Sequence, residues 1–237
     1  MKRPNVLKQC TPNSKSTDRA SRRFQQKYFI IEVVWPLFVT MSNMQLAFVR
    51  HGRTNSNELG RKGLFGQNDG LNTIGREQIE RAANILDKQA KPEVIICSPY
   101  LRTRESADIL AAFFKVAVEI DGRIQETDVG DWKGQVIENS IKEWLEVPPE
   151  QVHSYRPPNG ETWLEIGQRV VACVEDWAER EYESVLFVSH REPIRCGIGV
   201  LLGEDPTTWT DASYENGSVS LLQTSGTGYH EVFLNRA

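Results

Sequence analysis

Two of the four histidines in this 237-residue chain stand beside arginines in a pattern that suits chemistry on phosphate. His51 directly follows Arg50, His190 directly precedes Arg191, and Arg102 lies between them in the sequence. A phosphoryl group carries its negative charge on three outer oxygens, which arginine guanidinium groups can bind bidentately. An imidazole can attack phosphorus when one ring nitrogen is free and a hydrogen bond holds the other. Although a single histidine is more often structural, this combination indicates phosphoryl transfer.

Such a transfer also needs an acid that protonates the leaving alcohol and later activates water. Glu126 lies in the irregular stretch 121–160, where such a group can reach a site, and Asp128 is its local competitor. A solvated loop carboxylate is the alternative interpretation of Glu126. His190, when protonated, would stabilise charge on the transferring group. Gly52 would let the backbone turn sharply and bring a carbonyl or amide close to the first imidazole.

Hydrophobic periodicity predicts the elements that must position these side chains. From residue 45 onward, short apolar runs of the buried-strand type alternate with stretches of helical spacing. The predicted strands are Gln45–Arg50, Val94–Cys97, Val116–Ile120, Val185–Val188, Ser218–Gln223 and Tyr229–Leu234. The predicted helices begin at Asn72 or Thr73, at Ser98, near Ile141, at Gly160 and at Pro193. Ser98 is predicted to cap its helix, with Pro99 at the first helical position.

This alternation predicts an α/β fold of three layers, with helices on both faces of a mostly parallel central sheet. Ligands in such sheets bind outside the carboxyl ends of the strands. His51, Arg102 and His190 each follow a predicted strand closely. We therefore expect the two histidines and the arginines to converge at one edge of the sheet.

Six short blocks of residues occur along the chain in a fixed order. They are Arg50-His51-Gly52 with Thr54 and Asn57; Asp69, Leu71, Gly75 and Gln78; Ser98-Pro99 with Arg102 and Ala107; Glu126, Gly130, Trp132 and Gly134; Gly160-Glu161 with Arg169; and Val188-Ser189-His190 with Ile194-Arg195. In these blocks the chain resembles the histidine phosphatase superfamily, which includes cofactor-dependent phosphoglycerate mutases. The resemblance covers about residues 45–225 and implies the phosphoglycerate mutase-like fold.

The resemblance implies a role for each polar group. His51 would be the nucleophile that becomes phosphorylated. Glu126 would be the general acid and base, with its pKa raised by the closed site. The side chains that would hold the phosphoryl group are Arg50, Asn57, Arg102 and His190. The family uses no metal, and the chain is expected to need no metal and no cofactor.

Two residues after the second histidine depart from the family's usual small side chains. They are Arg191 and Glu192, and our hypothesis is that this pair shapes substrate choice, since a carboxylate in the pocket would repel a polyanion. The alternative is that both point outward at a helix start, where an acid is favourable in itself. Substrate contacts beyond the phosphoryl group are predicted at Arg53, Gln67 and Arg191, and Tyr100 is expected at the pocket mouth.

Phosphatases and mutases of this family share the phosphohistidine. A mutase must also hold a second phosphate, but the residues after Glu126, Thr127-Asp128-Val129, include no arginine. We therefore predict an enzyme that hydrolyses a small phosphate monoester, because transfer to water needs no second anion site. The alternatives are a phosphoglycerate mutase-type phosphomutase and a non-catalytic scaffold that binds phosphorylated ligands.

Charge divides the chain into two parts. Residues 1–43 hold eight basic and two acidic residues, a net charge of +6, whereas the remaining 194 residues carry −10. We interpret residues 1–43 as a disordered basic leader and residues 44–237 as the histidine phosphatase domain. A transit peptide, or translation that starts at Met41 or Met44, are the other interpretations of the leader.

Cysteine usage and charge predict the surroundings of the protein. Cys97, Cys173 and Cys196 stand among apolar neighbours, and the chain has no Cys-x-x-Cys pair. This pattern predicts buried thiols in the cytoplasm, without disulfides or structural zinc, unless the leader is a targeting segment. The apolar run Tyr28–Thr40 is too short to span a bilayer. The expected partner is a small phosphorylated metabolite, not nucleic acid or membrane, and a homodimer is the oligomer considered.

Overall fold

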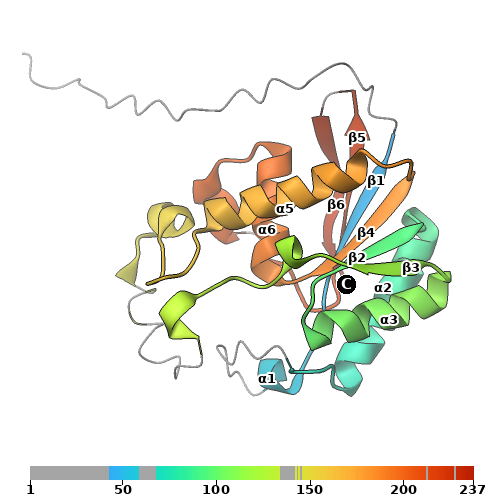
Figure 1. Cartoon of the computed structure of the whole chain (residues 1–237), viewed down its shortest axis with the longest axis horizontal. Coiled ribbons are helices and arrows are strands. Elements are labelled where there is room, and N and C mark those ends of the chain that lie inside the picture. The colour runs from blue at the N-terminus through green and yellow to red at the C-terminus, as the bar shows by residue number, and fades with distance from the viewer. Residues whose placement is uncertain are drawn as a thin grey trace, which may run out of the picture. The chain divides into compact units, whose positions relative to one another are not determined.

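Six strands form a single sheet at the centre of the part of the chain that the structure describes (Figure 1). The strands are β1 (Gln45–Arg50), β2 (Val94–Cys97), β3 (Ala117–Ile120), β4 (Ser184–Ser189), β5 (Val219–Ser225) and β6 (Gly228–Arg236). Their order across the sheet is β3-β2-β4-β1-β5-β6. The first four strands pair in parallel, and β5 and β6 extend the sheet antiparallel beside β1.

The structure is a computed structural model that describes residues 43–58, 68–133, 142, 144, 146–211, 213–226 and 228–237. The predicted leader lies outside these ranges except for Asn43, and so does Gln67. The predicted short helix at Ile141–Leu145 falls partly outside them; residues 142, 144 and 146 are helical. No helix within the described ranges is both long and apolar enough to cross a membrane.

Helices cover both faces of the sheet. They are α1 (Asn55–Glu58), α2 (Thr73–Gln89), α3 (Leu101–Phe114), α5 (Trp163–Ala178) and α6 (Arg191–Leu202). Short 3₁₀ turns occupy Gly122–Ile124, Gly130–Trp132, Pro149–Ser154 and Pro206–Asp211. Figure 1 shows α5 and α6 on one face, and α2 and α3 on the other. The predicted three-layer α/β architecture is confirmed.

Alternation along the strands supplies a hydrophobic core to each face. In β1, Leu46 and Phe48 pack into the core beneath α5 and α6, whereas Ala47 and Val49 pack into the core beneath α2 and α3. Consecutive side chains of a strand point to opposite faces, so a strand covered on both sides must be apolar throughout. All six residues of β4 are buried, as a central strand requires. This rigid sheet fixes the strand ends, where the polar residues stand.

Helix α5 confirms the predicted apolar face. Its buried residues include the five that the periodicity picked out: Trp163, Ile166, Val170, Val174 and Trp177. A reciprocal capping box starts the helix, because the Thr162 hydroxyl accepts from the Glu165 backbone N–H and the Glu165 carboxylate accepts from the Thr162 backbone N–H. The helix thus begins at Trp163, three residues after the predicted start at Gly160.

Two further helix starts differ from the prediction. Helix α3 begins at Leu101 with Tyr100 as its N-cap, and Ser98 does not cap it. Helix α6 begins at Arg191 rather than at Pro193. Proline is tolerated in the first turn of a helix, where a backbone N–H has no partner in any case. Pro193 therefore marks the first turn of α6 and not its first residue.

Candidate active site

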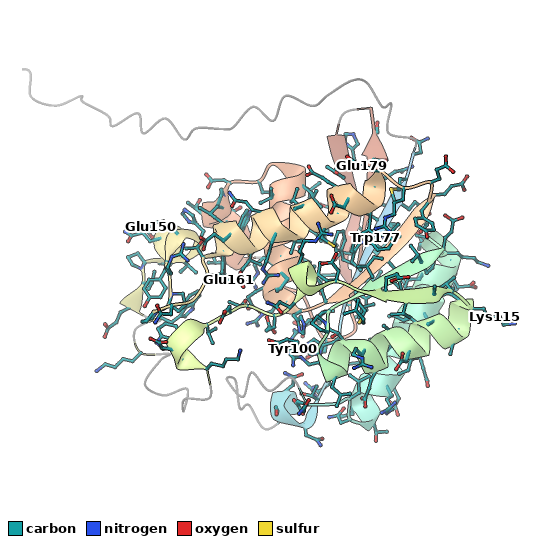
Figure 2. The ribbon with its side chains drawn as sticks, in the orientation of Figure 1. Tyr100, Lys115, Glu150, Glu161, Trp177 and Glu179 are labelled. Carbon is teal, nitrogen blue, oxygen red and sulfur yellow. The ribbon has the colours of Figure 1, made fainter. Side chains whose placement is uncertain are left out.

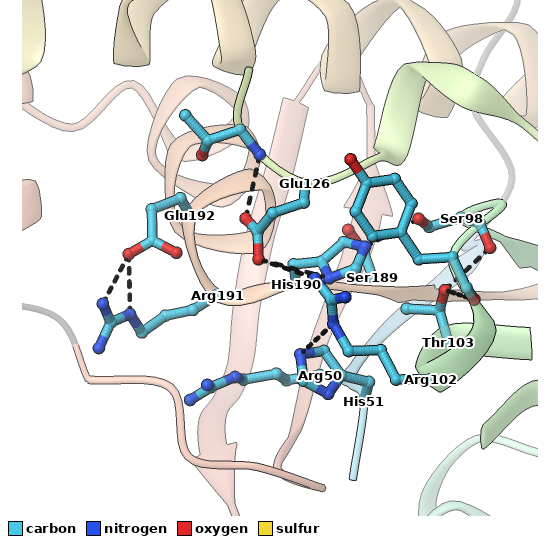
Figure 3. A network of polar contacts seen from close by, with 12 residues as sticks. Arg50, His51, Ser98, Arg102, Thr103, Glu126, Ser189, His190, Arg191 and Glu192 are labelled. Atoms are coloured by element: carbon cyan, nitrogen blue, oxygen red, sulfur yellow. Dashed lines mark hydrogen bonds and ion pairs between the residues drawn. The ribbon is translucent and has the colours of Figure 1, made fainter. Parts of the chain in front are cut away.

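The imidazole of His51 is held as a neutral base just after β1 (Figure 3). Its Nδ1 lies 2.8 Å from the Gly52 carbonyl oxygen, which can only accept, so Nδ1 carries the proton. Its Nε2 accepts from Nε of Arg102 at 3.2 Å. Burial, and then the charges of Arg102 and Arg50, lower the pKa of His51 well below its usual value. Nε2 is therefore unprotonated and carries the lone pair that a nucleophile needs.

Gly52 holds the loop after β1 against the start of α2. A Cβ atom at Gly52 would lie 2.3 Å from the carbonyl oxygen of Gly75, and one at Gly75 would lie 2.1 Å from the carbonyl oxygen of Arg53. Neither contact is possible for a real side chain, so both positions need glycine. The predicted closeness of the Gly52 carbonyl to the imidazole is confirmed, and tight backbone packing is the further reason for this residue.

Two arginines stand at the same edge of the sheet. Arg102, in the first turn of α3, is 6% exposed and points one guanidinium nitrogen, Nη2, at Oε2 of Glu126, 3.4 Å away. Its guanidinium also lies 4.8 Å from the centre of the Tyr100 ring. Arg50 ends β1 and donates from Nη1 to the Tyr214 carbonyl oxygen at 2.6 Å. Cationic forks thus flank His51, as predicted.

His190 directly follows β4 and is fully buried. Its Nε2 lies 2.8 Å from the Ser98 hydroxyl, and its Nδ1 lies 3.5 Å from Oε2 of Glu126. The rings of His190 and His51 are 5.2 Å apart, edge to face. Burial, followed by Arg102, lowers the pKa of His190 well below its usual value. Burial thus favours the neutral ring in this arrangement, and the protonated form expected with a bound phosphoryl group stays a prediction.

Glu126 completes the group of polar side chains that meet between the strand ends. Its side chain is 12% exposed, its Oε1 accepts from the Thr127 backbone N–H at 3.0 Å, and its Oε2 faces Arg102 and His190. Burial, and then the charge of Glu192, raise the pKa of Glu126. Asp128, its local competitor, is exposed and accepts from the Gly130 backbone N–H at 2.9 Å. Glu126 is thus the acid that the fold brings to the histidines.

A small open pocket of about 50 Å³ borders Glu126. Its lining residues are Tyr100, Gln125, Glu126, Thr127, Asp128, Val129 and Lys133. Tyr100 lies at the start of α3, opposite the end marked by Lys115, so this helix directs its N-terminus to the site (Figure 2). The pocket opens to solvent and has a carboxyl group at its wall, on the side from which a leaving alcohol would depart.

The remaining predicted site residues differ in where they lie. Asn57 is exposed, and its Oδ1 lies 3.4 Å from the amide nitrogen of Asn216, which also donates to the His51 carbonyl oxygen at 3.1 Å. Asn57 is therefore close to the nucleophile's loop. The backbone N–H of Arg53 donates to the Gln78 side chain at 2.8 Å. Gln67 lies outside the described residues, so its substrate contact stays a prediction.

Arg191 and Glu192 form an ion pair in the first turn of α6 (Figure 3). Nε and Nη2 of Arg191 each lie 2.8 Å from Oε1 of Glu192. Burial alone would raise the pKa of Glu192, but the charges of Arg191 and Arg195 bring it below its usual value. The side chain of Glu192 is 20% exposed and lies in the same network as Glu126 and Arg50 (Figure 3). The outward orientation considered from the sequence therefore does not describe Glu192, most of whose side chain is buried.

Two contributors to the site were not identified from the sequence. Ser98 was assigned to a helix cap, but its hydroxyl holds His190 instead. The loop containing Asn216 and Gly217 also lies against the nucleophile's backbone, because the Gly217 N–H donates to the Arg50 carbonyl at 3.0 Å. The position of Ser98 directly after β2 was the available signal, since it shares that placement with both histidines.

The cysteines and the possible metal ligands are the other reactive groups among the described residues. Cys97, Cys173 and Cys196 are buried and unpaired with one another, as predicted for these three residues. Among the residues that the structure describes, no three His, Cys, Asp or Glu side chains are grouped so that they could hold a metal ion.

Comparison with known proteins matches both the sequence blocks and the fold. The family model described as "Histidine phosphatase superfamily (branch 1)" matches residues 46–237. Phosphoserine phosphatase 1 of Hydrogenobacter thermophilus is 29% identical over 188 residues, which cover 76% of this chain and 86% of that protein. Glucosyl-3-phosphoglycerate phosphatase of Mycolicibacterium vanbaalenii is 30% identical over 176 residues, which cover 70% and 77%.

A solved structure has the same fold. The mycobacterial glucosyl-3-phosphoglycerate phosphatase superposes with a TM-score of 0.71 at 24% identity. The match covers 82% of this chain and all of that chain.

Proposed function

This chain belongs to the histidine phosphatase superfamily and is a phosphatase, and from that premise we propose that it hydrolyses a small phosphate monoester through a phosphohistidine on His51. Relatives with 29% and 30% identity are named as phosphatases of phosphoserine and of glucosyl-3-phosphoglycerate. Both names describe monoesters of small metabolites, which supports that class of substrate for this chain.

One observation carries the proposal: the unprotonated ring nitrogen of His51, Nε2, faces the place where the arginines converge. The Nδ1–H of His51 donates to the Gly52 carbonyl oxygen, and its Nε2 lies 3.2 Å from Nε of Arg102. A nucleophile aimed at cationic groups suits an electrophile that carries negative charge, and a phosphoryl group is such an electrophile.

In the first step, Arg50, Arg102 and His190 bind the phosphoryl oxygens. The approach of these oxygens draws the Arg102 guanidinium away from Nε2 of His51, because a dianion is a stronger acceptor than an imidazole. Nε2 then forms a bond to phosphorus while the bond from phosphorus to the ester oxygen breaks. Glu126 gives its proton to that oxygen, and the alcohol leaves through the adjoining pocket.

In the second step, water enters on the side that the alcohol has left. Glu126, now a carboxylate, takes a proton from the water while the oxygen of that water bonds to phosphorus. The bond between phosphorus and Nε2 breaks, and the ring nitrogen recovers its lone pair. Inorganic phosphate leaves, and both His51 and Glu126 return to their starting protonation states.

Hydrolysis is favoured over mutase chemistry by the charges around the leaving-group pocket. A mutase must hold two phosphoryl groups, whereas the described wall of this pocket carries one cationic side chain, Lys133, beside two carboxylic acids, Glu126 and Asp128. This balance supports a substrate with a single phosphoryl group.

Trapping of the intermediate tests the proposal directly. The protein is mixed with a ³²P-labelled alkyl monoester, quenched within milliseconds in alkali, and examined for labelled protein. Phosphohistidine survives alkali and is cleaved by acid, so label that acid releases and that His51→Asn abolishes supports the mechanism. If the wild-type protein releases phosphate and never carries acid-labile label, the phosphohistidine route is wrong.

Two further properties belong to the same proposal. We infer a cytoplasmic location, supported by the three buried free thiols, and catalysis without a metal, supported by a site whose charges can perform both steps. Phosphatase activity that survives exhaustive chelation with EDTA is the expected result. Loss of activity that is restored by one divalent metal would overturn the second inference.

A further inference from the structure

The ion pair between Arg191 and Glu192 lies at the start of α6, and the acid is its more buried partner. The side chain of Glu192 is 20% exposed and that of Arg191 is 41% exposed, so the guanidinium lies on the outer side of the pair. Both residues belong to the first turn of the helix whose N-cap is His190. Figure 3 shows the pair in the same network as Glu126, Arg50 and the two histidines.

The neighbours of Glu126 have opposite effects on its pKa. The charged and titratable groups that face it are Arg50 from β1, Arg102 from α3, and His190, Arg191 and Glu192 from α6, while Asp128 and Lys133 line the same pocket. Arg169 of α5 faces its backbone carbonyl, with Nη2 3.5 Å from the oxygen. The cations favour a carboxylate at Glu126, whereas burial and a neighbouring negative charge favour the protonated acid.

Phosphoryl transfer imposes a conflict on this carboxyl group. The arginines that must bind phosphate also favour loss of the proton that the leaving alcohol needs. Glu192 opposes them with its negative charge, and Arg191 and Arg195 keep Glu192 itself ionised.

We propose that Glu192, held by Arg191, is a positioning residue that keeps the proton on Glu126 for delivery to the leaving oxygen. The inference rests on the proposed function, because it gives Glu192 a part in the same reaction. The sequence hypothesis that the pair shapes substrate choice stays a separate prediction.

Both half-reactions use this arrangement. When the ester bond to phosphorus breaks, the proton leaves Glu126 for the departing oxygen, and two carboxylates then face one another. Their repulsion makes the new Glu126 carboxylate a better acceptor for the proton of the attacking water. As the oxygen of that water bonds to phosphorus, Glu126 recovers its proton, and the repulsion is relieved.

The test compares two substrates that differ in their need for an acid. An alkyl phosphate must have its leaving oxygen protonated, whereas p-nitrophenyl phosphate releases a stable phenolate without help. In Glu192→Gln, kcat/KM for the alkyl ester should fall by about tenfold at pH 8, with the basic limb of its pH profile moved to lower pH. The rate with p-nitrophenyl phosphate should change by less than about twofold, because no acid is needed for that leaving group.

A matched control is Glu215→Gln. Glu215 also acts on Arg50 and Arg191, but its carboxylate accepts a hydrogen bond from the Ser213 hydroxyl at 2.8 Å and is not among the groups that shift the pKa of Glu126. This variant should keep the wild-type pH profile with both esters. An unchanged alkyl profile in Glu192→Gln, or an equal loss with both esters, would overturn the inference.

A titration of the resting protein separates this inference from the proposed function. With carbon-13 label in the glutamate carboxyl groups, the Glu126 signal, assigned through Glu126→Gln, should titrate at lower pH in Glu192→Gln than in the wild-type protein. An unmoved titration refutes the role of Glu192 even if phosphohistidine forms normally. A moved titration in a protein that never forms phosphohistidine would uphold the charge relation and reject the reaction.

Discussion

The Ser98 hydroxyl lies 2.8 Å from Nε2 of His190, so a residue at the end of β2 fixes the ring that follows β4. These strands are neighbours in the sheet, and both side chains are fully buried. With Nε2 held by Ser98, Nδ1 is the nitrogen of His190 that faces Glu126. The sheet thus orients a catalytic side chain through a neighbouring strand.

Ser98→Ala should lower kcat without unfolding the protein. Loss of the hydroxyl leaves a buried ring nitrogen without its partner, at a cost of about 1–3 kcal/mol. We expect kcat to fall by about tenfold, because the ring is then free to turn away from the phosphoryl oxygens. Ser184→Ala is the matched control, since that buried hydroxyl has no hydrogen-bond partner among the described residues. Equal kcat values for the two variants would contradict this role.

Arg102→Ala should damage the reaction more than any loss of substrate affinity explains. Arg102 contacts the nucleophile and the acid, and it is buried, so its charge acts at low dielectric. Removal of such a group should lower kcat/KM by roughly 10²–10³-fold. Arg102→Lys should recover only part of the rate, because an ammonium lacks the planar fork. Arg104→Ala, on an exposed position of the same helix, should stay near wild type.

Gly52→Ala should destabilise the fold and misplace the nucleophile. The added methyl group would meet the backbone of Gly75, which no side-chain rotation can move. We expect a loss of about 3 kcal/mol in the free energy of unfolding, measured by denaturant titration. Gly122→Ala provides the comparison, because a Cβ atom there has no neighbour within 4 Å and its φ is not in the left-handed region. Similar unfolding curves for both variants would refute the close packing.

The buried histidines should make the protein less stable in mild acid. The pKa values of His51 and His190 are lowered in the folded protein, so below about pH 6.5 the unfolded chain binds protons that the folded protein does not. Their contribution to the free energy of unfolding is therefore present above that pH and lost as the pH falls, by up to about 1.4 kcal/mol per pH unit for each residue. Thermal unfolding from pH 7.5 to 5 measures the slope.

Two variants serve as controls for this slope. The double variant His51→Gln/His190→Gln should unfold with a flatter dependence on pH, whereas His230→Gln, at an exposed position, should keep the wild-type slope. Glu126 contributes with the opposite sign, because its raised pKa stabilises the fold as the pH falls. A wild-type slope in the double variant would show that other groups cause the acid sensitivity.

The elements that rest on periodicity were predictable from the sequence, and those that rest on a single side chain were not. The face of α5 from Trp163 to Trp177 repeats every three or four residues, and β4 is buried throughout, so both patterns survive small errors in their ends. Ser98 and Pro99 carry the same signal for a helix cap wherever they occur. Only the neighbouring strand shows that the hydroxyl serves His190 instead.

The residue types of the site were predictable from the sequence, but their charge and their orientation were not. His51, Arg50, Arg102, His190 and Glu126 do meet at the strand ends, as their positions after the strands implied. The charge of His190 and the orientation of Glu192 depend on burial and on charges from distant parts of the chain. No local pattern contains that information, because electrostatic neighbours are set by the folded sheet.

The hydrogen bond from Arg102 to His51 also has a consequence for the resting enzyme. A buried nucleophile whose lone pair is already engaged reacts slowly with stray electrophiles, such as acylating or alkylating agents. Arg102, the cation that covers Nε2, attracts phosphate oxygens strongly. A phosphate ester therefore exposes Nε2 as it binds. Arg102 thereby protects Nε2 of His51 in the resting enzyme, and the negative charge of the substrate removes this protection.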